Sequence, residues 1–305
     1  MKIAVCILTY KRMEGIRKAL LSLSHQRQDR ALFELVKIVV VDNDVNGEVE
    51  SLCSAMAPLV GTEILYQAEH RKGISYGRNT AVAGAIADVD CIAFLDDDEE
   101  ACADWLYELV CAMAATGADI VTGNINSILG PGTPDWVAKG RFYDRFAHRD
   151  LDRIDYARTG NVLIRSGVFH DCGRFDEKFA LTGGEDTVFF RGAHAAGKTI
   201  VWSSKALVHE TVEENRCNVK WILTRAFRVA GTNVISGIMV REKRGISVLR
   251  YLVRGSALVL YSLLLFPISA VTGFHAVVKA MTFSATGLGT ICGAFGYHHQ
   301  MYRTK

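Results

Sequence analysis

The sequence predicts an α/β protein in which helices flank a mostly parallel sheet, followed by a basic and apolar helical region. Short β-branched runs alternate with helix-like segments in the first half of the chain, which is typical of a parallel sheet covered by helices. Three of the predicted strands end in polar clusters, at the position where such sheets bind ligands. The 305 residues have room for one large α/β domain, or for a domain plus an appendage.

The predicted strands are short apolar runs, and the helix-like segments lie between them. Strands are expected at Lys2–Leu8, Val36–Val41, Glu63–Gln67, Cys91–Leu95 and Ile120–Gly123. Helices are expected at Glu14–His25, Val49–Met56, Ser75–Ala87, Ala103–Thr116 and Val219–Val229. Residues Gly130–Asp155 contain Gly and two prolines and are expected to form a long covering loop. Apolar order resumes at Gly160–Ile164 and Thr199–Trp202.

The most informative motif is Asp96-Asp97-Asp98, which follows the apolar run Cys91–Leu95. Three adjacent carboxylates repel one another unless a cation lies among them, and a divalent metal with a phosphorylated ligand is the usual one. Alternate residues of an extended chain point to one side, so we expect Asp96 and Asp98 to converge and Asp97 to point away. The competing interpretation is that the acids only cap the helix that starts near Ala103.

Polar clusters also follow the first two strands, Thr9-Tyr10-Lys11-Arg12 and Asp42-Asn43-Asp44. Together with the triple Asp they describe a pocket for a nucleotide diphosphate. Asp42 could accept from a base or ribose hydroxyl, and the planar guanidinium groups of Arg12 and Arg78 could bind phosphate oxygens. Simpler structural roles remain open: a turn cap for Asp42, a surface ion pair for Arg78, and tight turns at the glycines near Arg78.

A second acidic signal is Gly183-Gly184-Glu185-Asp186, which precedes a helix-like segment. Two glycines let the backbone approach a ligand closely, and a carboxylate at a helix start stays ionised, as a general base must. The alternative is a capping box without chemistry. His209, in Val208-His209-Glu210, is a candidate metal ligand, although a single His is more often structural.

Cysteine usage and the N-terminus predict a protein that starts inside the cell. The eight cysteines form no CxxC pair and mostly lie in apolar runs, which suits reduced thiols and indicates neither zinc nor disulfides. The apolar N-terminal run is too short for a signal peptide. No GxGxxG follows a predicted strand, which argues against a dinucleotide-dependent oxidoreductase.

The net charge of +2 hides a strong asymmetry along the chain. From Arg216 to Lys305 there are twelve Lys or Arg residues and one acid, Glu242. Two uncharged segments, Gly255–Phe274 and Ala280–Tyr297, lie in this part, and basic residues flank them. Basic charge beside apolar segments indicates an anionic membrane face rather than nucleic acid. A spanning hairpin, an interfacial helix pair and ordinary core helices remain open.

The motifs together resemble those of family 2 inverting glycosyltransferases with the GT-A fold. The resemblance rests on their order and spacing, and it covers about Met1 to Arg216. It includes Thr9-Tyr10-Lys11-Arg12, Val41-Asp42-Asn43 and Asp96-Asp97-Asp98, and three further motifs: Gly73-Ile74-Ser75-Tyr76-Gly77-Arg78-Asn79, Thr159-Gly160-Asn161 and Gly184-Glu185-Asp186. The segment Val208–Arg216 and the Gly-rich tail are similar, over a shorter match, to bacterial exopolysaccharide glycosyltransferases of the succinoglycan type.

The resemblance implies a division of the chain and a role for each matched residue. Residues 1–125 would be the nucleotide-sugar-binding half, 126–215 the acceptor and catalytic half, and 216–305 a membrane-associating region. Asp186, beside Glu185, would be the catalytic base. Asp98, with His209, would hold Mg²⁺ or Mn²⁺. Trp136 and Asn161 would face the sugars. The donor site would comprise Thr9, Tyr10, Arg12, Asp42, Asn43, Gly73, Arg78, Asn79, Asp96 and Asp97.

The implied reaction moves a sugar from a nucleotide donor, with UDP as the first guess, to a lipid-linked saccharide. It would take place at the cytoplasmic face of the inner membrane, during exopolysaccharide synthesis and without nucleic acid. A nucleotidyltransferase is the rival enzyme class, but it would normally want a Gly-rich basic loop after the first strand, and no glycine occurs there until Gly15. A membrane-bound binding module without turnover is the non-enzymatic alternative.

Overall fold

The computed structural model describes residues 1–44, 47–240 and 244–297, and their contacts divide the chain into two units. The first, here the sheet unit, comprises residues 1–126 and 145–210. The second, here the helical unit, comprises residues 127–144 and the described residues after 210. Every strand-end cluster predicted from the sequence belongs to the sheet unit.

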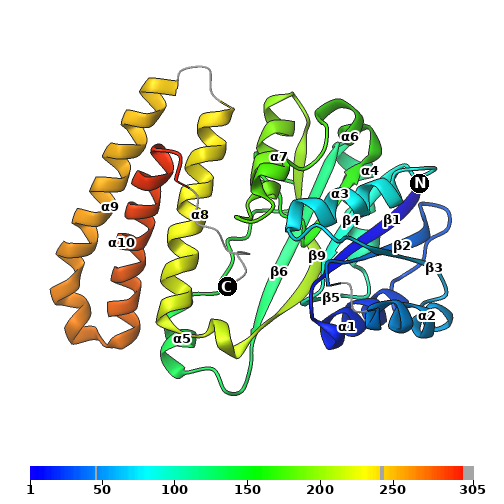
Figure 1. Ribbon diagram of the computed structural model, residues 1–305, viewed down its shortest axis with the longest axis horizontal. Helices are drawn as coiled ribbons and strands as arrows, with labels where there is room; N and C mark the ends of the chain where they lie inside the picture. The colour runs from blue at the N-terminus through cyan, green and yellow to red at the C-terminus, as the bar shows by residue number, and fades with distance from the viewer. Residues whose placement is uncertain (45–46, 241–243, 298–305) are drawn as a thin grey trace. The chain divides into compact units, whose positions relative to one another are not determined.

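Within the described residues, one mixed sheet of nine strands forms the sheet unit's centre, and two of its strands run on into the helical unit (Figure 1). One half is parallel, as predicted, and the other half is antiparallel. The parallel half consists of β3 (Glu63–Ala68), β2 (Glu34–Asp42), β1 (Lys2–Thr9) and β4 (Cys91–Asp96), in that spatial order. The sheet continues through β8 (Asn161–Arg165), β6 (Ile120–Leu129), β9 (Ile200–Val212) and β5 (Glu99–Ala101), and β7 (Arg153–Ile154) pairs with β9.

Helices cover both faces of the sheet because the side chains of each buried strand alternate between two apolar cores. In β1, Ile3, Val5 and Ile7 belong to one core, and Ala4 and Cys6 belong to the other. The first core is covered by α1 (Met13–Ser24), α2 (Glu48–Val60) and α4 (Trp105–Thr116). The second is covered by α3 (Ile74–Ala85), α6 (Ser166–Cys172) and α7 (Glu185–Ala195).

Two local expectations differ from the structure. Residues Gly130–Asp155 are not an unbroken loop, because they contain α5 (Asp135–Gly140) and β7. The triple Asp does not lead directly into a helix, because β5 follows it and α4 begins only at Trp105. The acids therefore do not cap α4. Two short 3₁₀ turns, Glu177–Phe179 and Glu214–Arg216, complete the described elements.

The helical unit consists mainly of α8 (Val219–Met239), α9 (Arg244–Thr272) and α10 (Phe274–Ala294), drawn in yellow to red in Figure 1. The helix α8 runs ten residues beyond the predicted end at Val229 because apolar residues continue on its buried side. Small residues bring α9 and α10 together: a Cβ on Gly255 would lie 2.8 Å from the carbonyl oxygen of Gly287. Arg241, Lys243, Arg303 and Lys305, the basic flanks predicted from the sequence, lie outside the described residues.

Candidate functional site

The strand register brings the three polar clusters side by side. Thr9, the last residue of β1, pairs with Asp42 of β2, and the preceding Leu8 pairs with Asp96 of β4. Thr9 and Asp42 are almost completely buried. The carboxyl ends of these parallel strands therefore form one edge on which a ligand can contact all three clusters.

Arg12 forms ion pairs with two of the acids that follow β4, Asp97 and Asp98. Its Nη1 donates to Asp97 Oδ1 at 2.7 Å and to Asp98 Oδ2 at 3.0 Å, and Thr9 Oγ1 donates to the second oxygen of Asp97 at 2.8 Å. Burial raises the pKa of Asp97, and Arg12 opposes that rise. We expected Asp97 to point away from the side on which Asp96 and Asp98 lie. This expectation is wrong, because residues 97 and 98 form a turn, in which side chains do not alternate between two sides as they do along a strand.

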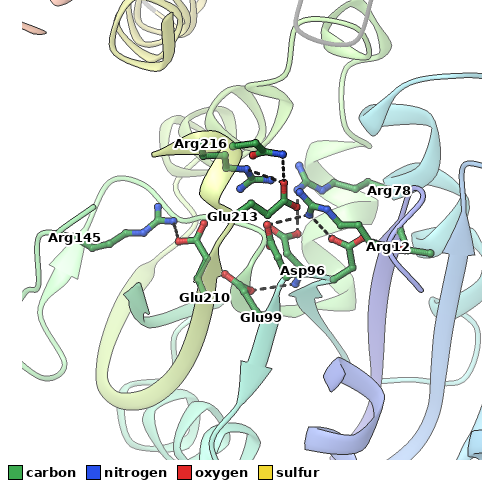
Figure 2. A network of polar contacts seen from close by, with 12 residues as sticks. Arg12, Arg78, Asp96, Glu99, Arg145, Glu210, Glu213 and Arg216 are labelled. Carbon is green, nitrogen blue, oxygen red and sulfur yellow. Dashed lines mark hydrogen bonds and ion pairs between the residues drawn. The ribbon is translucent and has the colours of Figure 1, made fainter. Parts of the chain in front are cut away.

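Arg78, on α3, is buried and holds two further carboxylates (Figure 2). It forms an ion pair with Glu185 at the start of α7, and its Nη2 lies 3.5 Å from Asp96 Oδ1. Burial raises the pKa of Asp96 to about 6, against the effect of Arg78, and the charges of Asp98, Asp97 and Asp186 add to the rise. Because Glu185 directly precedes Asp186, the shared Arg78 brings the start of α7 beside Asp96.

Glu99 is a buried acid of this site that the sequence interpretation did not include. Its carboxylate accepts the backbone N–H of Asp96 at 3.1 Å (Figure 2), and burial raises its pKa well above the usual range. Gly160 makes room for it, since a Cβ there would lie 2.5 Å from Glu99 Oε1. The run of five acids from Asp96 to Glu100 is the only signal in the sequence that pointed to Glu99.

Asn43 and Asn79 hold backbone segments near this edge through their amide groups. Asn43 donates to the carbonyl oxygens of Glu69 and Arg71 at 2.7 and 2.8 Å and accepts the N–H of Gly73 at 2.9 Å. Asn79 exchanges two hydrogen bonds with the backbone of Phe175. A direct contact with donor would break these bonds, so the geometry gives both residues a positioning role.

Gly73 has φ 142°, and a Cβ there would lie 2.7 Å from Ala180 Cβ, so this position requires glycine.

Tyr10 follows the last residue of β1 and is 40% exposed, with the ammonium groups of Lys11 and Lys72 at 5.3 and 5.6 Å from its ring centre. Asp42 accepts the N–H of Asp44 at 2.8 Å, and burial raises its pKa. These features fit a pocket for a planar base, which stays a prediction.

Asp186 lies in the first turn of α7, after Gly183 and Gly184 with φ of 71° and 90°. Its Oδ1 accepts the N–H of Thr187 at 2.6 Å. Glu185, by contrast, is 1% exposed and pairs with Arg78. Glu185 therefore holds Arg78 in place, and Asp186 is the acid of this pair that is available to a substrate.

The two predicted sugar contacts lie in different environments. Asn161 is completely buried: its Oδ1 accepts from Trp105 Nε1 at 2.8 Å, and its Nδ2 donates to Asn124 and Ala206 carbonyls at 2.9 Å. It therefore fixes strand ends, and the acceptor contact expected of it stays a prediction. Trp136 belongs to the helical unit, where its ring packs on Phe142 and Phe274.

The carboxylates of Asp96 and Asp98 fit a divalent metal better than the predicted pair of Asp98 and His209 does. Within the described residues, no group of three His, Cys, Asp or Glu side chains has metal-binding geometry, and His209 Nδ1 is hydrogen-bonded to Asn126 at 3.2 Å. Asp96 and Asp98 offer the hard oxygen donors that Mg²⁺ and Mn²⁺ prefer. Burial is the main cause of the raised pKa of Asp96, and the charges of Asp98, Asp97 and Asp186 add to it, so a cation held here would favour the ionised carboxylate.

Comparison with known proteins gives the class of enzyme. The family model described as Glycosyl transferase family 2 matches residues 4–173, more than half of the chain. The chain belongs to this family. Its glycosyltransferase relatives include the succinoglycan biosynthesis protein ExoM of Rhizobium meliloti (strain 1021), 35% identical over 243 residues, with 79% of this chain and 75% of the relative covered. Glycosyltransferase AglE of Haloferax volcanii is 27% identical over 209 residues, with 66% of this chain and 64% of the relative covered.

Solved structures of glycosyltransferases confirm the GT-A fold. S. aureus TarS, residues 1–349 in complex with UDP, matches with TM-score 0.53 and 16% identity over 98% of this chain and 93% of that one. GalNAc-T7 with UDP, GalNAc and Mn²⁺ matches with TM-score 0.58 and 14% identity over 77% of this chain, which spans 47% of its length. At these identities the likeness shows the fold, while the site residues of this glycosyltransferase rest on its own geometry.

The space beside Glu99 gives a test of the site's packing. We expect Gly160→Ala to destabilise the protein by about 1–3 kcal/mol, because the added Cβ would overpack the buried carboxylate of Glu99. Thermal or urea unfolding would measure the loss. Gly167→Ala on α6 is the matched control, since no atom lies within 4 Å of its Cβ position. Equal stability of the two variants would contradict the role given to Gly160.

Proposed function

We propose that this glycosyltransferase moves a sugar from a nucleotide-diphosphate donor, with UDP as the first candidate, to a hydroxyl of a lipid-linked saccharide, inverting the anomeric configuration. The observation that carries the proposal is that Arg78 pairs both with Asp96, at the end of β4, and with Glu185, the residue before Asp186 on α7. The name of ExoM supports a role in polysaccharide synthesis, and the UDP bound to TarS supports a uridine donor.

The chemistry needs one proton acceptor and one site for the leaving diphosphate. Asp186 would take the proton of the acceptor hydroxyl, whose oxygen bonds to the anomeric carbon as the bond from that carbon to the diphosphate breaks. Asp98, with Asp96, would hold Mg²⁺ or Mn²⁺, which supplies charge neutralisation at the departing phosphate. Arg78 would keep Asp96 in position, and Arg12 would do the same for Asp98.

The helix α9 supports a membrane location, because it buries small residues and exposes large apolar ones, the inverse of a helix in a soluble protein. One helix in the described residues, Ser247–Thr272 with mean hydropathy 1.8, is long and apolar enough to cross a membrane. It buries Ser247, Gly255, Ser262 and Ser269, each about two turns from the next. It exposes large apolar side chains: Leu249, Val253, Leu260, Leu263, Leu264, Ile268 and Val271 are each more than 60% exposed.

A soluble helix buries its large apolar residues, whereas helices in lipid pack through small residues and turn leucines outward. Ser262 donates to the Ala280 carbonyl at 2.7 Å inside the α9–α10 contact, which satisfies a polar group that lipid could not. We therefore place α9 in or on the anionic cytoplasmic leaflet, with Arg250 and Arg254 near the headgroups.

The donor is best identified by binding. A screen of nucleotide sugars, each with and without Mn²⁺, should show metal-dependent thermal stabilisation by the true donor, since a ligand of the native state raises stability by mass action. No stabilisation by any nucleotide sugar in the presence of metal would contradict the proposed donor class.

Asp98→Ala should abolish metal-dependent donor binding and leave the fold intact, because removing one acid from a cluster relieves repulsion in the metal-free protein. Calorimetric titration of UDP with and without Mn²⁺ measures the loss, and the unfolding temperature without metal is the control. Unchanged metal-dependent affinity would show that Asp98 is not a ligand.

Asp186→Asn should retain donor affinity and lose transfer by about 10²–10⁴-fold, since an amide keeps the shape but does not accept the proton. Single-turnover transfer from the identified donor measures the rate. A variant that transfers at more than a tenth of the wild-type rate would exclude Asp186 as the base.

The exposed face of α9 should carry the membrane attachment. Replacing Val253, Leu264 and Ile268 by Ser should weaken binding to vesicles containing anionic lipid, by about 1.5–3 kcal/mol for each side chain that lipid buries fully. Leu59→Ser on α2, equally exposed at 65%, is the control and should leave binding unchanged. Arg250→Gln and Arg254→Gln should each cost about 1 kcal/mol in a salt-sensitive way.

Extraction behaviour separates the two modes of attachment. An interfacial helix is released by high salt or alkaline carbonate, whereas an inserted one is not. A full-length protein that is soluble without detergent and has no affinity for anionic vesicles would contradict the membrane proposal.

A further inference from the structure

The helices α8, α9 and α10 form one layer of the helical unit, in which α10 lies between the other two (Figure 1). Small residues make both contacts. A Cβ on Gly287 would lie 2.6 Å from the carbonyl oxygen of Gly255 on α9, and a Cβ on Gly293 would lie 2.7 Å from that of Gly231 on α8. Helices packed this closely share one orientation, so whatever direction α9 takes in a membrane, α10 and α8 take it too.

One end of this layer packs against the ends of two strands. Trp136 on α5 contacts Phe274, the first residue of α10, with ring centres 5.2 Å apart. In the same small core, Val137 of α5 packs with Leu129 and Val212, the last residues of β6 and β9. The turn between α9 and α10 therefore lies on the same side of the layer as these strand ends.

A layer in this position is unsuited to crossing a bilayer. If α9 crossed, α8 would cross beside it, and α8 carries Arg225 and Arg228 within its length. Arginines inside a spanning helix are costly and rare. The basic residues between positions 241 and 254 would also lie across the membrane from the strand ends. Basic loops stay on the cytoplasmic side, which is the side proposed above for the nucleotide-sugar site.

The side chains of α9 suit contact along the whole length of the helix. At about 100° per residue, the large apolar side chains of Leu249–Val271 that are more than 60% exposed fall within an arc of about 140°, opposite the buried Ser262. Arg250, Arg254 and Tyr261 are exposed on one flank of this arc. Tyr261 is near the middle of α9, so a spanning helix would carry its hydroxyl to the bilayer centre, whereas on a flank it reaches the headgroups.

We propose that α9 lies in the plane of the membrane surface, with its apolar arc among the acyl chains of one anionic leaflet and the flank of Arg250, Arg254 and Tyr261 at the headgroups. The inference rests on the membrane location proposed above and assigns its mode, attachment without crossing. Because the buried side of α9 faces α10, both α10 and α8 lie on the water side. An enzyme held in this way reaches lipid-linked acceptors of one leaflet only.

Depth measurements on the full-length protein, bound to vesicles of phosphatidylglycerol and phosphatidylcholine, test this orientation. Val253, Leu260 and Val271 lie within the apolar arc, near the start, middle and end of α9. A nitroxide on a genetically encoded keto amino acid at each position leaves the eight cysteines unmodified. We expect equal depths at all three, about 5–10 Å into the boundary between headgroups and acyl chains. A label at Val229, 46% exposed at the middle of α8, should stay accessible to an aqueous relaxation agent.

A spanning helix would give a different depth profile. Labels at Val253 and Val271 would differ in position along the bilayer normal by about 27 Å, at about 1.5 Å of rise per residue, and the label at Val229 would lie in lipid. That profile would overturn the inference and leave the membrane location standing. Labels that stay in water at all three positions of α9 would instead contradict the membrane location itself.

Two adjacent substitutions give a second test. Leu260→Lys places a charge within the apolar arc and should weaken binding to the same vesicles by about 10- to 100-fold, on the order of one buried leucine. Tyr261→Lys places the same charge on the headgroup flank and should bind within about 5-fold of the wild type, since a surface Lys attracts anionic lipid. Unfolding temperatures without vesicles show whether each variant is folded. Equal losses in two folded variants would overturn the inference, because both residues would then lie at the same depth in lipid.

Discussion

The structure depends on the repulsion among the acids that follow β4 and on the two arginines that contain it. Five consecutive acids begin at Asp96, and Glu185 joins them from α7. Arg12 reaches them from the start of α1 and Arg78 reaches them from α3, so three helices meet at one strand end through charge. A buried charge that loses its partner costs several kcal/mol, which ties the positions of these helices to one another.

This charge balance also explains which parts of the site the sequence could predict. Strand ends are set by the change from apolar to polar residues, and the observed strands β1 to β4 start and end within two residues of the predicted bounds. The register then follows from parallel pairing, so the meeting of Thr9, Asp42 and Asp96 was predictable. The turn at residues 97 and 98 was not predictable, because no local rule distinguishes this turn from a continued strand. The turn directs Asp97 toward Arg12.

Residues whose role is to hold others could not be told from residues that touch ligands. Asn43, Asn79 and Asn161 stand in motifs that the family resemblance assigns to substrates, yet every polar atom of their amides is used by the protein. The sequence indicates which residue types lie at the site. Only their hydrogen-bond partners in the structure show which side chains are free to bind a ligand.

Donor and metal binding are coupled by the same charges, if the donor binds as proposed. A diphosphate brings negative charge to an edge that already holds an excess of it, and both Arg12 and Arg78 are committed to carboxylates there. The ion that Asp98 is proposed to hold would then supply positive charge to the phosphates. The ion would improve the site for the anion, and the anion would improve it for the ion, because linkage between binding free energies is reciprocal. Nucleotide affinity should therefore depend on metal concentration more steeply in this enzyme than in one whose arginines are free to bind phosphate.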